Sequence, residues 1–511
     1  MFEGQPKGLW ALALANTGER FGYYTMLAVF ALFLRANYGL DAGWAGEIYS
    51  DFLMLVYFFP LIGGWMADKF GFGKMVTIGI LIMFFGYLLL SIPLGGDTLA
   101  LVVMLAALVF IGFGTGLFKG NLQVMVGDLY NAPQYKDKRD SGFSIFYMAI
   151  NIGALFAPTA AIEIMKWAQT ELNVSVNDSY HFAFAVACAS LILSIAIYYI
   201  FRPTFRHVEG EKKKDSNKTA AASNEEELTP QETKQRIIAL CLVFAVVIFF
   251  WMAFHQNGLT LTYFANEFTA TKSTGIEAMT FNVWNLVCII VMVYAGFSLF
   301  QSKAGKTKAI SAAVLLAALA VLIIQYFNLG DSVSISAPIF QQFNPFYVVA
   351  LTPVSLAIFG SLARKGKEPS APRKIAYGML IAAVGFVIMA MGSIGLPMPQ
   401  TEIVDGNEVA VHVADVTPQL LIYTYLVLTF AELLLSPMGI SFVSKVAPPK
   451  LKGLMMGGWF VATAIGNKLV GVGGYLWGNI PMWAVWTVFI VLCILSAIFM
   501  FAMMKRLEKV A

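Results

Sequence analysis

Apolar runs of about 20 residues or more recur along this 511-residue sequence. A helix of that length crosses the hydrocarbon core of a bilayer. The sequence is 59% hydrophobic and 13% charged, which is too apolar for an ordinary soluble domain. We therefore expect an all-α, multi-pass integral membrane protein. The expected membrane-spanning helices number 14, namely 9–34, 46–66, 74–94, 99–127, 141–162, 181–201, 236–265, 277–300, 307–327, 343–363, 374–394, 418–443, 453–477 and 483–504.

The positions of Lys and Arg predict how these spans are oriented, because cytoplasmic loops of membrane proteins carry an excess of both residues. The loops at 163–180, 328–342 and 395–417 are poor in Lys and Arg. The cations cluster at the other ends of the spans, at Lys69 and Lys74, Lys136 to Arg139, Arg202 to Arg236, Lys303 to Lys308, Arg364 to Lys374, Lys445 to Lys452 and Lys505 to Lys509. An even number of spans then places both termini in the cytoplasm.

The composition changes abruptly near the middle of the chain. Residues 203–234 contain a run of lysines at 212–214 and a run of glutamates at 225–227. Such a polar stretch is typical of a solvated linker. We expect it to join an N-terminal six-helix bundle at 1–202 to a C-terminal bundle at 235–511, and the second bundle then holds two spans more than the first.

A stripe of polar residues interrupts the first apolar run. Its members are spaced three and four apart, so they share one face of a helix: Asn16, Glu19, Arg20, Tyr23 and Tyr24. Ionised groups at lipid depth cost several kcal/mol unless they face protein, water or each other. Intramembrane ionisable groups therefore indicate a functional site. The alternative is a fixed ion pair that only holds helices together.

A glycine-rich turn between the second and third spans provides a further signal. The segment from Gly63 to Lys74 reads GGWMADKFGFGK and lies on the expected cytoplasmic side. Glycine such as Gly64 allows close backbone approach, and Asp68 and Lys74 are suited to brace the neighbouring helix ends. The segment resembles the signature loop of major facilitator transporters, in which two six-helix halves rock around a central site.

Glu19 to Tyr24 and this loop together resemble the proton-dependent oligopeptide transporter family, also called the POT family. Further matching stretches lie in the expected order along the chain, so the resemblance covers almost all of it: 112–130, 139–153, 341–370, 431–439 and 453–467. It implies the major facilitator fold, a bacterial inner-membrane location and import of di- and tripeptides by proton symport. Short peptides and protons are thus the expected ligands, with a bilayer as the surroundings and a monomer as the working unit.

The resemblance also locates the two additional spans. Trp251 to Gln256 matches the family's seventh span and 343–363 its eighth. An inserted transmembrane hairpin is therefore expected at about 276–327. Its sequence is mostly Ala, Val, Leu and Ile, so we expect it to pack at the periphery of the bundle.

A peptide presents an ammonium, a carboxylate and a polar backbone, so its pocket needs separated opposite charges and amide partners. The resemblance implies that Glu432 meets the peptide's amino terminus, with Lys119 and Arg20 as the cations. It also implies polar contacts and a cavity wall from the remaining expected binding residues, Tyr23, Tyr24, Tyr57, Asn151, Gln256, Asn344, Ser436 and Trp459.

Four positions depart from the family pattern, and one of them is Gly120, where the family has proline between Lys119 and Asn121. Asn16 stands where the family has a second glutamate, Leu27 where it commonly has arginine, and His255 where an acidic residue precedes Gln256. An amide does not exchange a proton near neutral pH, so Asn16 removes one titrating group. The remaining proton-coupling candidates are Glu19 with Arg20 and Lys119, Glu432, His255 and Asp51. The departures leave open a second reading, in which the same fold carries another small nitrogenous solute or lacks proton coupling.

Other functional classes have little support. The sequence has no nucleotide loop, nucleophile triad, metal-ligand cluster or pore-filter motif, which argues against an enzyme, a metal site, a cofactor or a channel. No basic patch with interleaved aromatics indicates a nucleic-acid partner. The four cysteines all lie within apolar runs and have no CxxC spacing.

Overall fold

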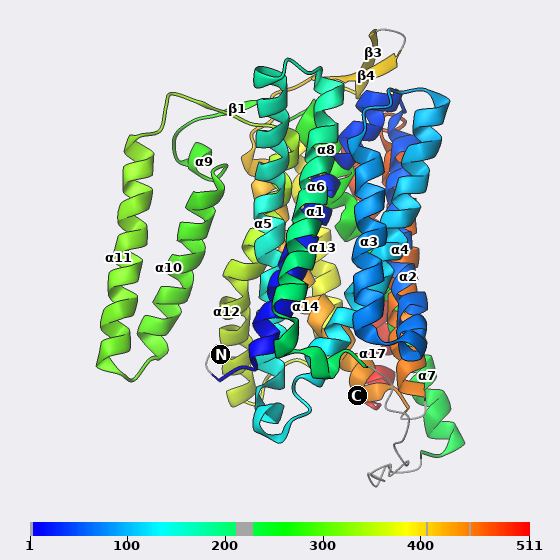
Figure 1. Ribbon diagram of the computed structural model, residues 1–511, viewed down its shortest axis with the longest axis vertical. Coiled ribbons are helices and arrows are strands. Elements are labelled where there is room, and N and C mark those ends of the chain that lie inside the picture. Colours follow the sequence, from blue (N-terminus) through cyan, green and yellow to red (C-terminus); the bar gives the residue numbers. More distant parts are fainter. Residues whose placement is uncertain (1–3, 211–227, 405–406, 449–450, 511) are drawn as a thin grey trace.

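The computed structural model describes residues 4–210, 228–404, 407–448 and 451–510. Both chain termini lie at the same end of a helical bundle, which we call the terminal end, and the opposite end is the distal end (Figure 1). The charged runs at 212–214 and 225–227 lie outside the described residues.

The first half of the chain consists of six long helices. They are α1 (Lys7–Tyr38), α2 (Ala42–Phe70), α3 (Phe72–Ser91), α4 (Thr98–Asp128), α5 (Arg139–Glu171) and α6 (Val176–Ile200). Three short 3-10 segments accompany them: η1 (Pro133–Lys138), η2 (Arg202–Thr204) and η3 (Arg206–Val208). Within this half α3 packs on α4, and α1 packs on α5 and α6.

The second half begins with α7 (Pro230–Phe254), η4 (His255–Gly258) and α8 (Thr260–Glu267). It continues with α9 (Gly275–Met279), α10 (Val283–Gln301), α11 (Gly305–Phe327), η5 (Ala337–Gln342), α12 (Phe343–Arg364), α13 (Ala371–Gly392), α14 (Gln419–Val446), α15 (Lys452–Leu469), α16 (Gly471–Leu476) and α17 (Met482–Glu508). The four strands are β1 (Lys272–Ser273), β2 (Val333–Ser334), β3 (Gln400–Val404) and β4 (Asn407–Val411).

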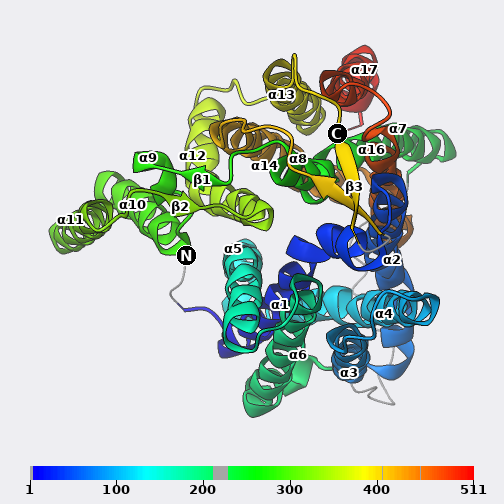
Figure 2. The same cartoon turned by 90° about the horizontal axis from the view of Figure 1, so that it is seen from above.

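Within the described ranges, 12 helices are long and apolar enough to cross a membrane. Helix α1 and the α15–α16 pair pack among them and occupy the two other expected spans. The polar stripe lowers the hydropathy of α1, and Asn467 and Lys468 lower that of α15. The two halves form two groups of helices side by side in Figure 2. The expected all-α membrane fold of two bundles with an added hairpin is thereby confirmed.

Helices α10 and α11 form an antiparallel hairpin that stands beside the two bundles (Figures 1 and 2). Helix α10 packs along α12 and α5, whereas α11 packs mainly on α10. The Tyr294 hydroxyl donates to the Val349 carbonyl at 3.2 Å and so ties α10 to α12. The Ser311 hydroxyl on α11 donates a hydrogen bond of 2.8 Å to the Ser298 hydroxyl on α10. The outer surface carries exposed apolar side chains such as Leu316, as expected for a surface in contact with lipid.

Two of the spanning segments are broken, and one side chain joins the breaks. The first break is η4, between α7 and α8, and the second is at Val470, between α15 and α16. The Gln256 amide donates to the carbonyls of Met252 at 3.1 Å and Val470 at 3.0 Å. Its oxygen accepts from the Thr260 hydroxyl at 2.8 Å. Gln256 thus satisfies backbone groups that the breaks release, which is the condition for irregular backbone inside a membrane bundle.

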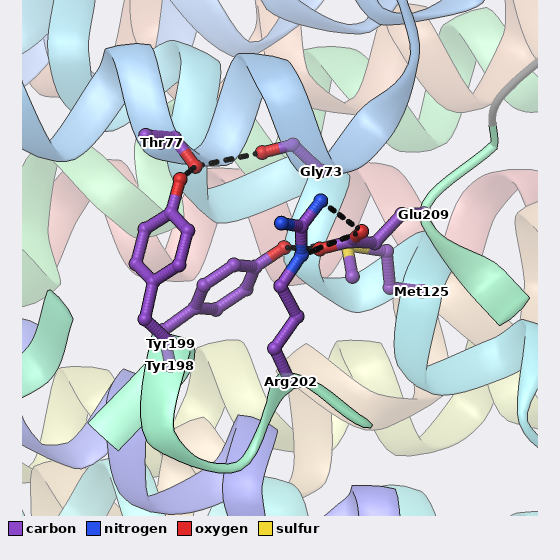
Figure 3. Close-up of polar contacts among 7 residues, drawn as sticks. All are labelled: Gly73, Thr77, Met125, Tyr198, Tyr199, Arg202 and Glu209. Carbon is purple, nitrogen blue, oxygen red and sulfur yellow. Dashed lines mark hydrogen bonds and ion pairs between the residues drawn. The ribbon is translucent and has the colours of Figure 1, made fainter. Parts of the chain in front are cut away.

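The segment after α6 belongs to the first bundle rather than to a linker. Glu209 is buried and accepts hydrogen bonds from Tyr198 at 2.9 Å and from the Arg202 guanidinium at 2.8–3.0 Å (Figure 3). Its carbonyl accepts from the Gly73 N–H at 3.1 Å at the start of α3. The expected linker of 203–234 is therefore too long at both ends, because 203–210 pack on the bundle and α7 already begins at Pro230. A Thr229 capping box starts α7 there.

The distal end carries a β-hairpin that the sequence analysis did not anticipate. Strands β3 and β4 pair antiparallel in the expected loop 395–417, with Gln400 opposite Val411. Strand β4 contacts α1, so this element of the second half reaches over the first half. The alternation of polar and β-branched residues in 400–411 is a sequence pattern typical of such a β-hairpin.

We expect Glu209→Ala to destabilise the protein by about 1–3 kcal/mol, because the buried Tyr198 hydroxyl and Arg202 lose their acceptor. The unfolding midpoint of the purified protein in detergent should fall. The matched control is Glu163→Ala, which removes an exposed ion pair of 3.6 Å with Lys166 and should change stability by less than about 0.5 kcal/mol. Equal midpoints for the two variants would contradict a stabilising role of Glu209.

Candidate functional site

A cavity of about 310 Å³ lies between the two halves. Helices α1, α2, α4 and α5 line it from the first half, and α7, η4, α12, α14 and α15 line it from the second. Most of the side chains expected at the site reach this cavity. They are Arg20, Tyr23, Tyr24, Tyr57, Lys119, Asn151, His255, Asn344, Glu432, Ser436 and Trp459.

The first half contributes the cations of the cavity. The Arg20 guanidinium donates two hydrogen bonds to the Glu19 carboxylate, at 2.5 and 2.6 Å, and both side chains are buried. Arg20 also lies over the Tyr23 ring, 4.4 Å from its centroid. The Lys119 ammonium lies 4.2 Å from the centroid of the Tyr57 ring. Glu19 itself does not line the cavity, so Arg20 separates this carboxylate from any bound ligand.

The second half contributes an acidic group. The Asn344 amide on α12 donates to the Glu432 carboxylate on α14 at 2.9 Å and to the Thr429 hydroxyl at 3.0 Å. One hydrogen bond orients the carboxylate while leaving most of its acceptor capacity for a ligand. The cavity therefore has cations from one half and a carboxylate from the other.

Amides and aromatic rings fill the wall between these charges. Asn151 donates to the Tyr147 carbonyl at 3.0 Å, which leaves its side-chain oxygen as an acceptor toward the cavity. The His255 ring stacks on Trp251 at 4.9 Å, and its Nδ1 lies 2.5 Å from the Asn467 side-chain oxygen. The Asn467 amide contacts the Leu53 carbonyl at 3.5 Å, so His255 Nδ1 is the donor and Nε2 remains free to accept a proton.

Trp459 forms a rigid wall of the cavity. It is buried on α15, and its ring packs against Gly439 on α14, where any larger residue would collide with the ring. Pro437 lies inside α14, two residues before this contact. Proline removes one helical hydrogen bond, so α14 is locally adaptable beside Ser436 and the cavity.

Two expected site residues lie elsewhere. Gln256 is fully buried, and its amide is occupied by the bonds that join the helix breaks, so the expectation that it contacts the ligand is corrected. Asp51 does not line the cavity. Its carboxylate binds the Lys468 ammonium at 2.5 Å, and Lys468 also binds Glu47. This trio joins α2 to α15 and hence the two halves.

The glycine-rich turn at the terminal end differs in detail from the expectation. Helix α2 ends at Phe70, and Gly71 turns the chain with φ of 93°. The close approach is made by Gly63, which touches the backbone of α4, whereas Gly64 faces open space. Asp68 and Lys74 are exposed, and within the described residues neither forms an ion pair. Bracing of the helix ends by these two charges is therefore not part of this conformation.

A buried ion pair at the distal end joins the halves, and the sequence analysis missed it. Arg35 on α1 binds Glu267 on α8, and both side chains are buried. The Trp477 indole donates to the same carboxylate at 3.1 Å, and Arg35 lies 4.7 Å from the centroid of the Tyr263 ring. The sequence did contain a signal for this pair: Arg35 lies just past the end of the expected span 9–34, and Glu267 lies just past the end of the expected span 236–265.

Hydrogen bonds from side chains also join the two halves. The Gln341 amide donates to the Ala28 carbonyl of α1 at 3.1 Å, and the Thr159 hydroxyl donates to Gln342 at 3.3 Å. The Tyr263 hydroxyl donates to the Ala42 carbonyl at 3.3 Å. These bonds all run from one half to the other, so together with the Arg35–Glu267 pair they hold the two halves in contact.

In the described part of the chain, no group of three or more His, Cys, Asp or Glu side chains is arranged to hold a metal ion. The charged groups of the cavity are instead arranged singly, at separate positions around its wall.

Comparison with protein families identifies one match. The family described as PTR2, POT family, matches residues 73–223 and 320–479, which is more than half of the chain.

Individual proteins align over nearly the whole chain. The uncharacterized transporter YclF of Bacillus subtilis (strain 168) is 28% identical over 499 residues, covering 94% of this chain and 90% of that protein. A di-/tripeptide transporter of Lactococcus lactis subsp. lactis (strain IL1403) is 26% identical over 502 residues, covering 92% and 89%. A crystal structure of a peptide transporter POT variant with alafosfalin has a TM-score of 0.73 at 24% identity and covers 100% of this chain and 96% of that chain.

We expect Glu267→Gln to destabilise the protein, because Arg35 would remain buried without its partner charge. Breaking a buried ion pair from one side costs about 3–5 kcal/mol. The double variant Arg35→Gln with Glu267→Gln should recover part of that loss, since no unpaired charge remains. The unfolding midpoint in detergent measures each change. A double variant as unstable as the sum of the two single variants would show that the pair is not coupled.

Proposed function

The chain belongs to the POT family, and on this premise we propose that it is a secondary transporter that imports di- and tripeptides by proton symport. The bipolar cavity between the halves carries the proposal, because it combines Arg20 and Lys119 with Glu432 in one enclosed space. The di-/tripeptide transporter of Lactococcus lactis, aligned along nearly its whole length, supports the cargo.

The groups of the cavity correspond to the groups of a short peptide. Glu432, oriented by Asn344, receives the ammonium of the peptide. Lys119 and Arg20 attract its carboxylate, and the free oxygen of Asn151 accepts a backbone N–H. The tyrosines and Trp459 enclose the side chains. At about 310 Å³, the cavity lies at the lower end of the range of about 300–1,000 Å³ that is usual for small-molecule sites.

Transport proceeds by alternating access, with the two halves rocking around this cavity. The contacts of Arg35 with Glu267 and of Lys468 with Asp51 close the distal end in the present state and must separate in the opposite state. We place the terminal end in the cytoplasm of a bacterial inner membrane, since the Lys- and Arg-rich loops lie there. One chain holds the complete cavity, so a monomer suffices.

Proton coupling centres on Glu19. Its carboxylate is held by Arg20, and a peptide carboxylate that draws Arg20 away leaves Glu19 buried without a counterion. A buried carboxylate without a counterion binds a proton. Cargo and proton thus favour the same conformational step, which is the condition for coupling. Asn16 cannot share this task, and the unprotonated Nε2 of His255 is a second acceptor within the cavity.

The departures at Asn16, Leu27 and His255 favour one alternative within the same fold, a transporter of another small nitrogenous solute or one without proton coupling. Vesicles reconstituted with the purified protein distinguish the alternatives. Uptake of a panel of di- and tripeptides is measured with and without an inward proton gradient. We expect the gradient to stimulate uptake. Gradient-independent uptake, or transport of amino-acid derivatives alone, would favour the alternative.

We expect Glu432→Gln to abolish uptake of peptides with a free amino terminus. The substitution removes a charge-assisted contact worth about 1.5–3 kcal/mol, which is about 10- to 150-fold in affinity. Uptake into vesicles and direct binding of a labelled dipeptide measure the loss. Glu402→Gln, on the exposed strand β3, is the matched control and should behave like the parent. Normal uptake by a folded Glu432→Gln protein would remove Glu432 from the ammonium site.

We expect Glu19→Gln to retain exchange of peptide across the membrane while losing accumulation driven by a proton gradient. Asn16→Glu should instead make accumulation depend more steeply on external pH, because it adds a titrating carboxylate. Counterflow measures exchange, and accumulation at a series of external pH values measures coupling. Glu171→Gln, at the exposed end of α5, is the control. Concentrative uptake by Glu19→Gln equal to the parent would move the proton site to His255 or Asp51.

A further inference from the structure

A second and larger cavity borders the central one. It measures about 890 Å³ and lies between α5, α10 and α12. Tyr147 and Asn151 line both cavities, so these two side chains of α5 form the partition between them. The second cavity extends along α12 as far as Arg364 in its last turn, at the terminal end of the bundle. One of its three walls is therefore supplied by the added hairpin.

The face of the hairpin that lines this cavity carries three polar residues beside Phe297. Tyr294, Ser298 and Gln301 line it and are spaced four and three apart, so they share one face of α10. The rest of α10 is almost wholly apolar, as the expectation of a peripheral hairpin assumed. A polar stripe at lipid depth is costly unless it faces protein or water. Here the stripe meets both conditions, because Tyr294 donates to the Val349 carbonyl and Ser298 accepts from Ser311, while the three side chains also border the open space.

The wall of the cavity mixes apolar surface with polar groups, and the polar groups favour water over lipid. Nine of the 16 lining residues carry a hydroxyl, amide or guanidinium group, and Thr352 on α12 faces the cavity at mid-membrane depth. A roomy cavity with polar walls holds water, whereas apolar cavities stay dry or accept apolar guests. The mouth is cationic, because Arg364 and Lys365 lie exposed there, near the hairpin turn that carries Lys303.

We propose that the space between α5, α10 and α12 is a water-filled vestibule through which cargo passes between the central cavity and the cytoplasm, with α10 as one wall. This inference rests on the proposed function and adds a route to it. Tyr147 and Asn151 are the side chains that cargo passes first. Arg364 meets the carboxylate of zwitterionic cargo at the cytoplasmic mouth. The added hairpin is then a part of the transport path.

Cysteine labelling tests whether the vestibule contains water. The four native cysteines, Cys188, Cys241, Cys288 and Cys493, are first replaced by alanine. Thr352→Cys then places a thiol about 18 Å from Arg364 along α12. Val384→Cys is the matched control, since Val384 is 52% exposed on the outside of α13, about 20 Å from its start.

Inside-out vesicles are treated with the membrane-impermeant cation methanethiosulfonate-ethyltrimethylammonium. We expect Thr352→Cys to react at least 10-fold faster than Val384→Cys, and a saturating dipeptide to slow the reaction. Equal slow reaction at both positions, or reaction of Thr352→Cys only with a lipid-soluble maleimide, would overturn the proposal in favour of a lipid-filled groove.

A second arm tests the hairpin wall without depending on the folding of a bulky variant. Ser298→Cys is nearly isosteric, and its modification by the same reagent should reduce dipeptide counterflow at least fivefold. Dithiothreitol should restore the rate. The control is Ile310→Cys. Ile310 is 55% exposed and is next to Ser311, which donates a hydrogen bond to Ser298. After modification with the lipid-soluble maleimide, this variant should keep the parental rate.

The two arms separate this inference from the proposed function. Fast labelling of Thr352→Cys in a protein whose parent moves no dipeptide would retain the water-filled vestibule and reject peptide transport. Counterflow that is unaffected by modified Ser298→Cys, in a protein that does transport peptides, would reject the hairpin as a wall of the path.

Discussion

Charged side chains within the membrane bundle require partners, and this requirement organises the structure. Glu19 and Arg20 neutralise each other within α1, whereas Arg35 with Glu267 and Lys468 with Asp51 join the two halves. Separating the buried pairs, Glu19 with Arg20 and Arg35 with Glu267, would leave a charge without compensation in a low-dielectric environment, whereas the Lys468 pair is partly exposed. The halves therefore stay closed at the distal end until water or a ligand takes over the role of a partner. The same constraint that stabilises the bundle makes its conformation responsive to charged cargo and protons.

The central cavity uses this constraint for recognition. Asn344 holds Glu432 with one hydrogen bond, and Lys119 interacts with the Tyr57 ring rather than with a carboxylate. These charges are positioned but not fully compensated, so a ligand with both charges gains from both. Gln256 contributes indirectly, because its bonds to Met252 and Val470 hold together the two helix breaks beside the cavity. A broken helix with satisfied backbone groups is suited to bend when the halves rock.

The added hairpin lies at the periphery of the bundle but lines a cavity that borders the central one, which is why we propose a role for it in the path. Its outer surface is apolar and suited to lipid, while Tyr294, Ser298 and Gln301 face a space that borders the central cavity. Because two spans are added together, the orientation of all later helices is unchanged. In the proposed vestibule, an insertion of this kind adds a wall on the terminal side of the central cavity without altering the central site.

Much of this protein follows from the sequence alone. The 14 apolar runs determine the number of membrane-spanning segments because each must cross the same thickness of hydrocarbon, and the ionisable stripe of α1 identifies a site because burying charge there is costly. Glu432 in the middle of a span was recognisable for the same reason, and Lys119 was recognisable from the resemblance to the family. The interaction partners of these residues were not recognisable from the sequence. The partners depend on which faces of distant helices meet. That packing decides whether Gln256 faces a ligand or a helix break and whether Asp51 binds a proton or Lys468. It also brings Arg35 to Glu267. Only the tertiary packing decides that, since the interaction that satisfies each polar group comes from residues far away in the chain.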